Sequence, residues 1–399
     1  MTRLDLNTAD AFVDTPGVGK RGVLREAASG ETSLRYELFE TLEAARPIWQ
    51  GLEARGVFSP YQRYDWIAAL IEARGLDGRL AIVAVHEGNH AVAILPLVVT
   101  IRLGLKTARI VGWVIGNGDW VGMDPGFARR LDKPLLDQLL AGVARLTAAD
   151  LLVLHSQPES WDGVANPFLA MPHQPSPDHF YAAPLSDVRL NAKRIRNIER
   201  GRRRLEEALG TVRLVRAATP EAVDTIHAEF LRQRGIRFKE MGVANIFAED
   251  GLRRFFRIAT LQGLGSPRPT LAMHALYAGD EIVATSVGSF SGDHYAQYIN
   301  STTDGPAAKY SLMGLLMFDL VEELRRDGVT SIDMGLGDFD YKLDWTDQQV
   351  SHDAVLPLSP IGSLAAGGLL GLRAAKRAIK QNPTLWRFAT SVRSLLNRR

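Results

Sequence analysis

The chain of 399 residues is 46% apolar and 23% charged, with a formal net charge of +2, a composition typical of a globular protein of about two or three domains. It has no cysteine, which excludes disulfide bonds, thiolate zinc sites and a cysteine nucleophile. No apolar run approaches the ~18 residues of a membrane span, and Asp5 and Asp10 lie where a signal peptide would be apolar. We therefore expect a cytoplasmic protein, and the net charge alone does not indicate nucleic-acid binding.

The first half of the chain has the periodicities of an α/β domain. A polar tail without periodicity is expected to be loose over residues 1–33. Helical periodicity over Tyr61–Arg74 is followed by an alternating segment, Leu80–Ala93, which predicts a β-hairpin. A further helix and strand are expected at Leu131–Thr147 and Asp150–His155.

The turn of this hairpin also matches the His-Glu-x-x-His spacing of zinc proteases, as His86-Glu87-Gly88-Asn89-His90. That chemistry needs both histidines on one face of a helix, with the glutamate beside a metal-bound water. Gly88-Asn89 between two alternating apolar runs predicts a turn instead. We therefore expect no metal site, and a zinc hydrolase is an alternative that stoichiometric metal binding would reveal.

A proline-rich stretch, residues 157–187, is expected to connect the two halves. An arginine-rich helix candidate follows at 188–208. The next helix is expected to begin at Pro220, because proline suits the first helical position and Thr219 suits the N-cap.

The second half repeats the order of elements of the first. Leu271–Ala284 aligns without gaps on Leu80–Ala93 and shares six identical residues with it. A helix over Ser311–Arg326 and a strand over Thr330–Met334 follow, as a helix and a strand follow the first hairpin. We infer a duplication that gives two α/β (α+β) domains, each a mixed, mostly antiparallel sheet flanked by helices. The expected domain bounds are 34–156 and 188–358.

Two segments of the second half carry groups suited to acyl transfer. Lys309–Gly314 opens a helix, and a helix N-terminus offers unpaired N–H groups and a positive dipole end to a pyrophosphate. Gly335–Lys342 places two glycines, two aspartates and a lysine on a loop directly after a strand. Together they give the order of elements that a coenzyme-A acyltransferase needs.

These motifs resemble the GNAT-superfamily acetyltransferase domain of CelD-like proteins, which are associated with cellulose biosynthesis and related to the tandem-GNAT Fem aminoacyltransferases. The motifs lie between residues 34 and 358 and are Phe58-Ser59-Pro60, Ala93 to Leu97, the arginine-rich helix, Leu271 to Phe290, Tyr310 to Gly314, and Tyr341 to Trp345. The resemblance implies tandem GNAT-like domains in a bacterial protein, with acetyl-CoA or another acyl-CoA as co-substrate and no metal. It also implies acyl transfer linked to polysaccharide or cell-envelope biosynthesis.

The expected cofactor-binding residues are Lys309, Tyr310, Ser311 and Gly314. The N–H groups of the first helical turn would hold the pyrophosphate, with Ser311 as the helix cap and Lys309 supplying positive charge. An ordinary helix cap without a ligand is the alternative.

The expected catalytic residues are Lys342, Tyr341 and Asp338. Lys342, just inside a strand, would stabilise the oxyanion that forms when an amine or hydroxyl attacks the thioester, and Tyr341 would donate a proton to the departing thiolate. Asp338 would be the general base for the acceptor. Asp338 and Asp340 also spell Asp-x-Asp, which leaves a divalent metal or simple solvated turn residues as alternatives.

The first half lacks a phosphate-binding turn, so we expect it to recognise the acceptor, a small molecule or a saccharide. Tyr61, Asp119 and Trp120 are the expected substrate-binding residues, because sugars pack on aromatic faces. The wider aromatic set is Tyr61, Tyr64, Trp66, Trp113 and Trp120, for which core packing is the alternative.

Two basic segments leave partners open. The helix at 193–204 would bind the 3′-phosphate of CoA, a tRNA in a Fem-type aminoacyl transferase, or only its own glutamates Glu199, Glu206 and Glu207. Residues 361–399 contain no Asp or Glu and eight Lys or Arg. The tail over 359–399 would therefore be helical, and would either contact the inner face of a membrane or pack on the body. Its apolar positions are Leu370, Ala374, Ile379, Trp386, Val392 and Leu396. A non-catalytic, membrane-associated scaffold is the corresponding alternative function.

Overall fold

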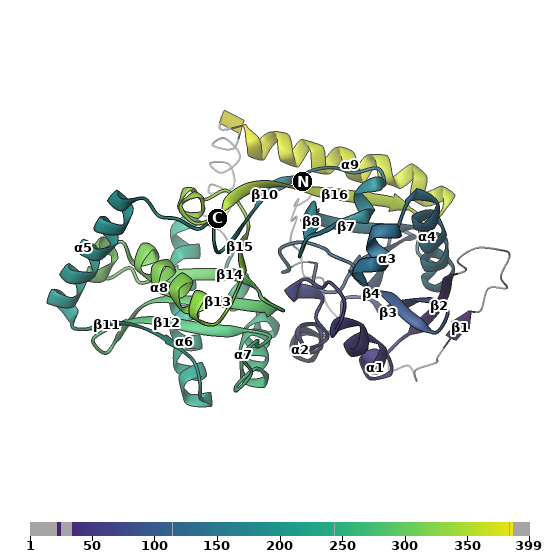
Figure 1. The fold of residues 1–399 in the computed structure, drawn as a ribbon. Coiled ribbons are helices and arrows are strands. Elements are labelled where there is room, and N and C mark those ends of the chain that lie inside the picture. Colours follow the sequence, from purple (N-terminus) through teal and green to yellow (C-terminus); the bar gives the residue numbers. More distant parts are fainter. Residues whose placement is uncertain (1–21, 25–33, 114, 243, 383, 386–399) are drawn as a thin grey trace.

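The computed structural model describes residues 22–24, 34–113, 115–242, 244–382 and 384–385, which form two lobes built on a mixed, mostly antiparallel sheet flanked by helices (Figure 1). The expected fold class is confirmed. The first half comprises β1 (Gly22–Leu24), β2 (Leu34–Phe39), α1 (Leu42–Glu53), η1 (Pro60–Gln62), α2 (Tyr64–Arg74), β3 (Arg79–Glu87), β4 (His90–Arg102), β5 (Leu105–Ile110), β6 (Gly122–Met123), α3 (Pro125–Arg130), α4 (Lys133–Thr147) and β7 (Leu151–Gln157). The middle of the chain comprises β8 (Ser160–Trp161), β9 (Val164–Ala165), η2 (Pro167–Ala170) and β10 (Gln174–Pro184).

The second half follows the same plan. Its elements are α5 (Ala192–Leu209), β11 (Val212–Arg216), α6 (Pro220–Met241), η3 (Ile246–Ala248), α7 (Asp250–Gln262), β12 (Ala272–Ala278), β13 (Glu281–Ser291), β14 (His294–Thr302), η4 (Pro306–Lys309), α8 (Leu312–Arg326), β15 (Ser331–Leu336), η5 (Asp340–Asp344), β16 (Asp347–Pro357) and α9 (Pro360–Gln381). Apart from β6 and α3, the order strand, two helices, three strands, helix, strand occurs in both halves, and it contains the repeated helix, hairpin, helix and strand that the sequence predicted.

The two predicted hairpins are confirmed. Leu80–Ala93 and Leu271–Ala284 both form antiparallel pairs, and Gly88 and Gly279 take the left-handed conformation (φ +57° and +59°) that favours glycine in such turns. The His86–His90 segment is therefore a turn between β3 and β4, as expected. The described residues contain no group of three or more His, Cys, Asp or Glu side chains that could hold a metal ion.

Local sequence signals also predicted where helix α6 begins. Thr219 caps α6, since its side chain accepts a hydrogen bond from the N–H of Ala222 at 3.2 Å. Within the tail expected to be loose, Gly22–Leu24 forms strand β1, which pairs with β2. The rest of that tail lies outside the described residues.

Each half completes its sheet with a strand from the other part of the chain. β16 pairs antiparallel with β7, with Ala354 opposite Leu154, and β10 pairs antiparallel with β15, with Ala183 opposite Ile332. Because β10 and β16 also pair with each other, one continuous path runs β1-β2-β3-β4-β5-β7-β16-β10-β15-β14-β13-β12-β11, with β6 beside β4.

This exchange corrects two expectations. The stretch 157–187 is more than a connector, because β10 is a long internal strand of the sheet. The region expected as the second domain, 188–358, ends in a strand that completes the first half. Proline lacks an N–H, and the pairing of β10 with β16 is irregular between Pro175 and His179, where Pro177 also lies.

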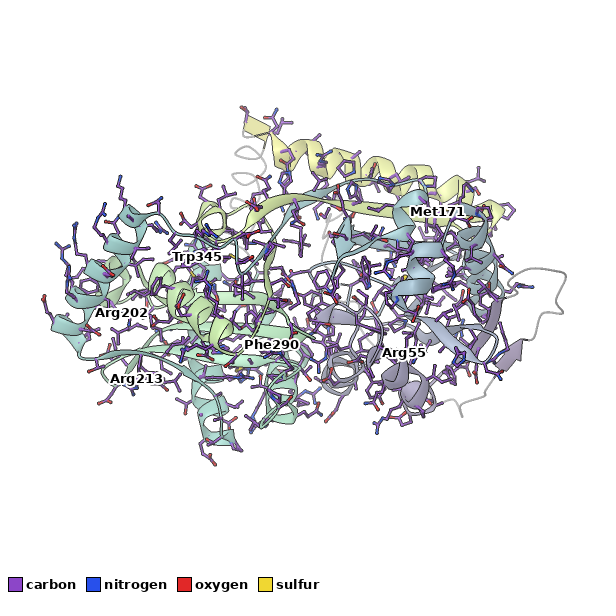
Figure 2. The ribbon with its side chains drawn as sticks, viewed as in Figure 1. Arg55, Met171, Arg202, Arg213, Phe290 and Trp345 are labelled. Atoms are coloured by element: carbon purple, nitrogen blue, oxygen red, sulfur yellow. The ribbon has the colours of Figure 1, made fainter. Side chains whose placement is uncertain are left out.

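The halves also share a hydrophobic core. α2 packs on α7, and the rings of Trp66 and Phe255 meet edge to face with centroids 5.0 Å apart. Arg63 of the first half donates a hydrogen bond to the carbonyl of Phe290 at 2.6 Å, and Phe290 lies near the middle of the molecule in Figure 2. A buried apolar core, together with this hydrogen bond between the halves, joins the two lobes.

Helix α9 packs on β10 and β16 along one edge of the molecule (Figure 1). Ser359 caps it by accepting from the N–H of Gly362 at 3.1 Å. Packing on the body is thus confirmed for 360–381, with Leu370 half-buried, whereas Trp386, Val392 and Leu396 lie outside the described residues. None of the helices in the described residues combines the length and hydropathy needed to cross a membrane.

Gly362 is expected to set how closely α9 approaches the sheet. A Cβ atom there would lie 1.8 Å from the carbonyl oxygen of Asp150, whereas one at Gly368 in the same helix would meet nothing within 4 Å. We expect Gly362→Ala to lower the free energy of unfolding by about 1–3 kcal/mol through overpacking. Gly368→Ala should leave it unchanged or raise it by up to about 1 kcal/mol. Urea titration followed by circular dichroism measures both, and equal values would show that the contact is unimportant.

Candidate active site

In the second half, the parallel strands β14 and β15 are paired along only part of their length. β14 and β15 pair only at His294 with Ser331, Tyr295 with Ile332, and Ala296 with Asp333, although β14 continues to Thr302. Backbone groups beyond this point are not used between these two strands, so the gap can offer hydrogen bonds to an amide-containing ligand. The charged loop and η5 follow directly after β15.

Lys342 lies in η5, so the expectation that it starts a strand is wrong. It is buried, with 3% of its surface exposed, and its Nζ donates to the carbonyl of Leu336 at 2.8 Å. Its Nζ also lies 5.0 Å from the centre of the Tyr181 ring. Burial lowers the pKa of Lys342 to about 8, because removal from water disfavours the ammonium; nearby Asp333 offsets only part of that effect.

Asp338 meets two side chains of the exchanged strand β10. Its Oδ1 lies 2.8 Å from Nδ1 of His179 and accepts a hydrogen bond from the hydroxyl of Tyr181 at 2.9 Å. Burial raises the pKa of Asp338, but these two hydrogen bonds outweigh it and hold the pKa below the ordinary value. The carboxylate therefore stays ionised at neutral pH and can fix the orientation of His179.

Tyr341 points toward β14 and α6. Burial raises its pKa, while Arg234 and a hydrogen bond with Asn300 oppose that shift. Arg234 donates to the carbonyl of Asn300 at 3.3 Å, and burial lowers the pKa of Arg234 to about 10. Tyr341 is thus a neutral phenol beside a cation at the open end of the strand pair, which suits a proton donor.

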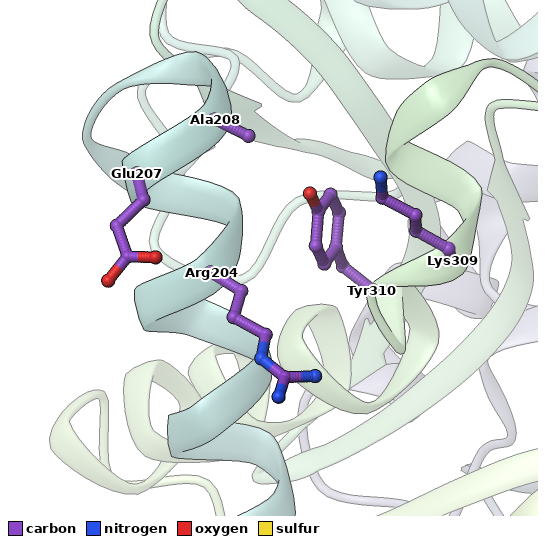
Figure 3. A pocket seen from close by; sticks show the side chains of 5 residues that line it. All are labelled: Arg204, Glu207, Ala208, Lys309 and Tyr310. Atoms are coloured by element: carbon purple, nitrogen blue, oxygen red, sulfur yellow. The ribbon is translucent and has the colours of Figure 1, made fainter.

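A pocket of about 550 Å³ lies between α5 and η4 (Figure 3). It is lined by Arg204, Glu207, Ala208, Lys309 and Tyr310. The Nζ of Lys309 lies 5.0 Å from the centre of the Tyr310 ring. The pocket therefore presents two cations, one carboxylate and an aromatic ring next to the start of α8.

Ser311 stands at the N-cap position of α8 but does not cap it, which corrects the expectation. Its backbone is left-handed (φ +41°, ψ +39°), and its side chain accepts no hydrogen bond from the first turn. The N–H groups of that turn therefore lack a side-chain partner. Gly314 needs no glycine for space, because a Cβ there would lie an ordinary 3.5 Å from Ile198 on α5.

Two arginines of α5 pair with other elements of the fold, rather than with Glu199, Glu206 or Glu207 as one alternative had it. Arg202 pairs with Asp319 of α8 and Arg194 with Asp344 of η5, each at 2.5 Å. These two ion pairs connect α5 to α8 and to η5, which both belong to the candidate site. Arg202 is labelled in Figure 2 on the outer helix of the second lobe.

The expected acceptor residues of the first half do not form an aromatic cleft. Trp120 is 2% exposed, and its ring N–H donates to the carbonyl of Val57 at 3.0 Å, so it belongs to the core. Asp119 is also buried, and burial raises its pKa to about 7 although the N–H of His155 donates to it. Tyr61 is buried where the halves meet, with its ring 6.0 Å from that of Tyr298.

Comparison with known proteins identifies the class. Residues 192–343 match a family model described as Acetyltransf_6, an acetyltransferase (GNAT) domain. Residues 192–343 thus correspond to a GNAT acetyltransferase domain, which supports an acyltransferase. A search of curated proteins found no match.

Solved structures are similar in fold. FemX has 10% sequence identity and a TM-score of 0.54, over 80% of this chain and 97% of that chain. A tandem GNAT protein from the clavulanic acid biosynthesis pathway has 14% identity and a TM-score of 0.43, over 82% and 99%. The C-terminal domain of a putative lysylphosphatidylglycerol synthetase from Agrobacterium fabrum has 13% identity and a TM-score of 0.49, over 82% and 96%. The similarity to FemX supports the mixed α/β fold, a mostly antiparallel sheet flanked by helices.

Sequence reasoning missed the residues that reach the site from distant elements. His179 and Tyr181 come from β10, and Arg234 comes from α6. Nε2 of His294 on β14 lies 2.7 Å from Oδ2 of Asp333 on β15, within the short stretch where these two strands are paired. The one available signal was the run from Asp178 to Tyr181, whose aromatic residues favour a strand within the proline-rich stretch.

The low pKa of Lys342 predicts a pH-dependent stability. Between about pH 8 and its ordinary value of 10.5, the unfolded lysine binds a proton that the folded one does not, so its contribution to stability rises with pH in that window. We expect the wild type to gain up to about 2–3 kcal/mol relative to Lys342→Met as the pH rises from 8 to 10.5. Urea unfolding of both proteins at several pH values measures this, and a constant difference would contradict it.

Proposed function

We propose that the second half binds acyl-CoA and transfers its acyl group to an amine or hydroxyl. The observation that carries the proposal is the uncapped first turn of α8 beside the pocket lined by Arg204 and Lys309, within the region that matches a GNAT domain. GNAT domains typically use acyl-CoA. The chemistry of these groups fits it, since free N–H groups and two cations suit a pyrophosphate and a further phosphate.

Bound acyl-CoA would supply the activated acyl group. The first-turn N–H groups of α8 would bind the pyrophosphate, and Arg204 and Lys309 would bind the remaining phosphate charge. Unused backbone groups of β14 beyond Ala296 would hold the amide-containing arm.

The loop residues would manage protons around that acyl group. We assign the general base to the Asp338–His179 pair, with His179 taking the proton from the acceptor and Asp338 orienting its ring. Tyr341 would protonate the leaving sulfur. Lys342 would act chiefly by holding the turn at Gly335 and Leu336 in place, because its Nζ is directed to their carbonyls.

The acceptor is proposed to be a small molecule or a saccharide used in polysaccharide or cell-envelope biosynthesis. The resemblance to CelD-like proteins supports this class, whereas Tyr61, 2% exposed, is buried where the halves meet and gives it no support. The buried position of Trp120 gives it no support.

Calorimetric titration with acetyl-CoA and with CoA tests the donor. We expect saturable binding to the wild type and a dissociation constant at least about tenfold higher for Arg204→Gln/Lys309→Gln, because charge-assisted hydrogen bonds to phosphate are lost. Arg129→Gln/Lys133→Gln, which removes the same charge from exposed positions of the first half, should bind like the wild type.

Absence of saturable binding by the wild type would rule out the acyl-CoA donor. Equal weakening in both double variants would show that overall charge, rather than this pocket, controls the affinity.

One observation supports a second candidate donor of the acyl group, an aminoacyl-tRNA. α5 also exposes Arg196, Arg200 and Arg203, and such a row suits the phosphates of an aminoacyl-tRNA. In that case tRNA should bind with an affinity that falls steeply with salt, and Arg196→Gln/Arg200→Gln should reduce the slope of that dependence. Filter binding at several salt concentrations decides between the two donors.

A further inference from the structure

Helix α9 is fixed on the body by its inner face. Arg373 forms a bidentate ion pair with Asp353, a carboxylate with no exposed surface, and Lys380 pairs with Asp178. The side chain of Gln174 donates to the carbonyl of Leu370 at 2.9 Å. These contacts on β10 and β16 set the rotation of the helix, and so they also decide which residues face outward.

The outward face of α9 is apolar along its length. Ile361, Leu364, Leu372 and Ile379 expose 63%, 86%, 68% and 40% of their surfaces. At about 100° per residue these positions fall within an arc of about 80°, and the stripe extends about 27 Å. The positions between them on this face are small, namely Gly368, Gly371 and Ala375.

All charges of the helix are basic, and they lie away from the centre of this stripe. Arg373, Arg377 and Lys380 are on the inner half, and Lys376 is on the shoulder, where a long side chain can extend toward lipid phosphates. No Asp or Glu occurs from residue 361 to 399. An aqueous surface seldom leaves a stripe of this length uncovered.

The charges of α9 indicate what covers its apolar stripe. Arg373 and Lys380 are paired with Asp353 and Asp178, so Lys376 and Arg377 carry the remaining charge of the helix. A second copy docked through the same stripe would bring these like charges closer together, which is unfavourable. An anionic lipid surface offers apolar depth for the stripe and negative charge for Lys376 on its shoulder.

We propose that α9 is an interfacial helix, which lies flat in the surface of an anionic bilayer through Ile361, Leu364, Leu372 and Ile379. The body of the protein stays on the aqueous side. This inference is independent of the proposed acyl-CoA site, because the four stripe residues line neither the pocket nor the charged loop.

Vesicle flotation of the full-length chain tests the inference. We expect the wild type to bind phosphatidylcholine vesicles that contain phosphatidylglycerol, and to bind pure phosphatidylcholine less well. Leu364→Glu/Leu372→Glu should lower the partition coefficient at least about tenfold, since both side chains lose their apolar burial. Both residues are exposed, so unchanged circular dichroism and calorimetric acetyl-CoA binding would show an intact fold and donor site.

The matched control is Ile101→Glu/Leu103→Glu, which makes the same chemical change at two exposed apolar residues around the β4–β5 turn. It should bind vesicles like the wild type. Three results would overturn the proposal: no binding by the wild type, equal binding by the Leu364→Glu/Leu372→Glu variant, or equal loss in the control. A dimer that this variant converts to monomer, without vesicle binding, would assign the stripe to a second copy.

Discussion

The exchange of β10 and β16 is the constraint on which the rest of the structure depends. A sheet edge with unpaired N–H and C=O groups must be paired or covered, and here the edges of β7 and β15 are both closed by strands from elsewhere in the chain. Because β10 and β16 also pair with each other, neither half has a complete sheet of its own. The shared core around Trp66 and Phe255 then buries apolar surface from both halves.

The same exchange builds the candidate site. β15 delivers Asp338 and Lys342 on the loop that follows it, and β10, lying beside β15, delivers His179 and Tyr181 to meet them. Hydrogen bonds lower the pKa of Asp338, which keeps the aspartate ionised. Burial lowers the pKa of Lys342, which favours the neutral amine. Separated pKa values among neighbouring groups are a common property of sites that move protons.

The helix that follows β16 depends on the exchange as well. α9 can lie flat only because β10 and β16 form a surface beneath it, with Asp353 ready to receive Arg373. A helix held in this way has no freedom to turn Leu364 and Leu372 inward. Its apolar outer face is therefore a fixed property of the folded molecule.

The sequence alone determined the local elements and the motif order. The hairpin turns at Gly88 and Gly279, the Thr219 cap and the helix at Ser311 depend on neighbours within a few residues, so period and turn chemistry were enough to predict them. Tertiary structure alone decided that Trp120 is core and that Ser311 leaves the helix uncapped. It also brought His179 to Asp338 and turned Leu364 outward. These outcomes depend on strand pairing and desolvation between residues far apart in the chain, and no local pattern encodes either.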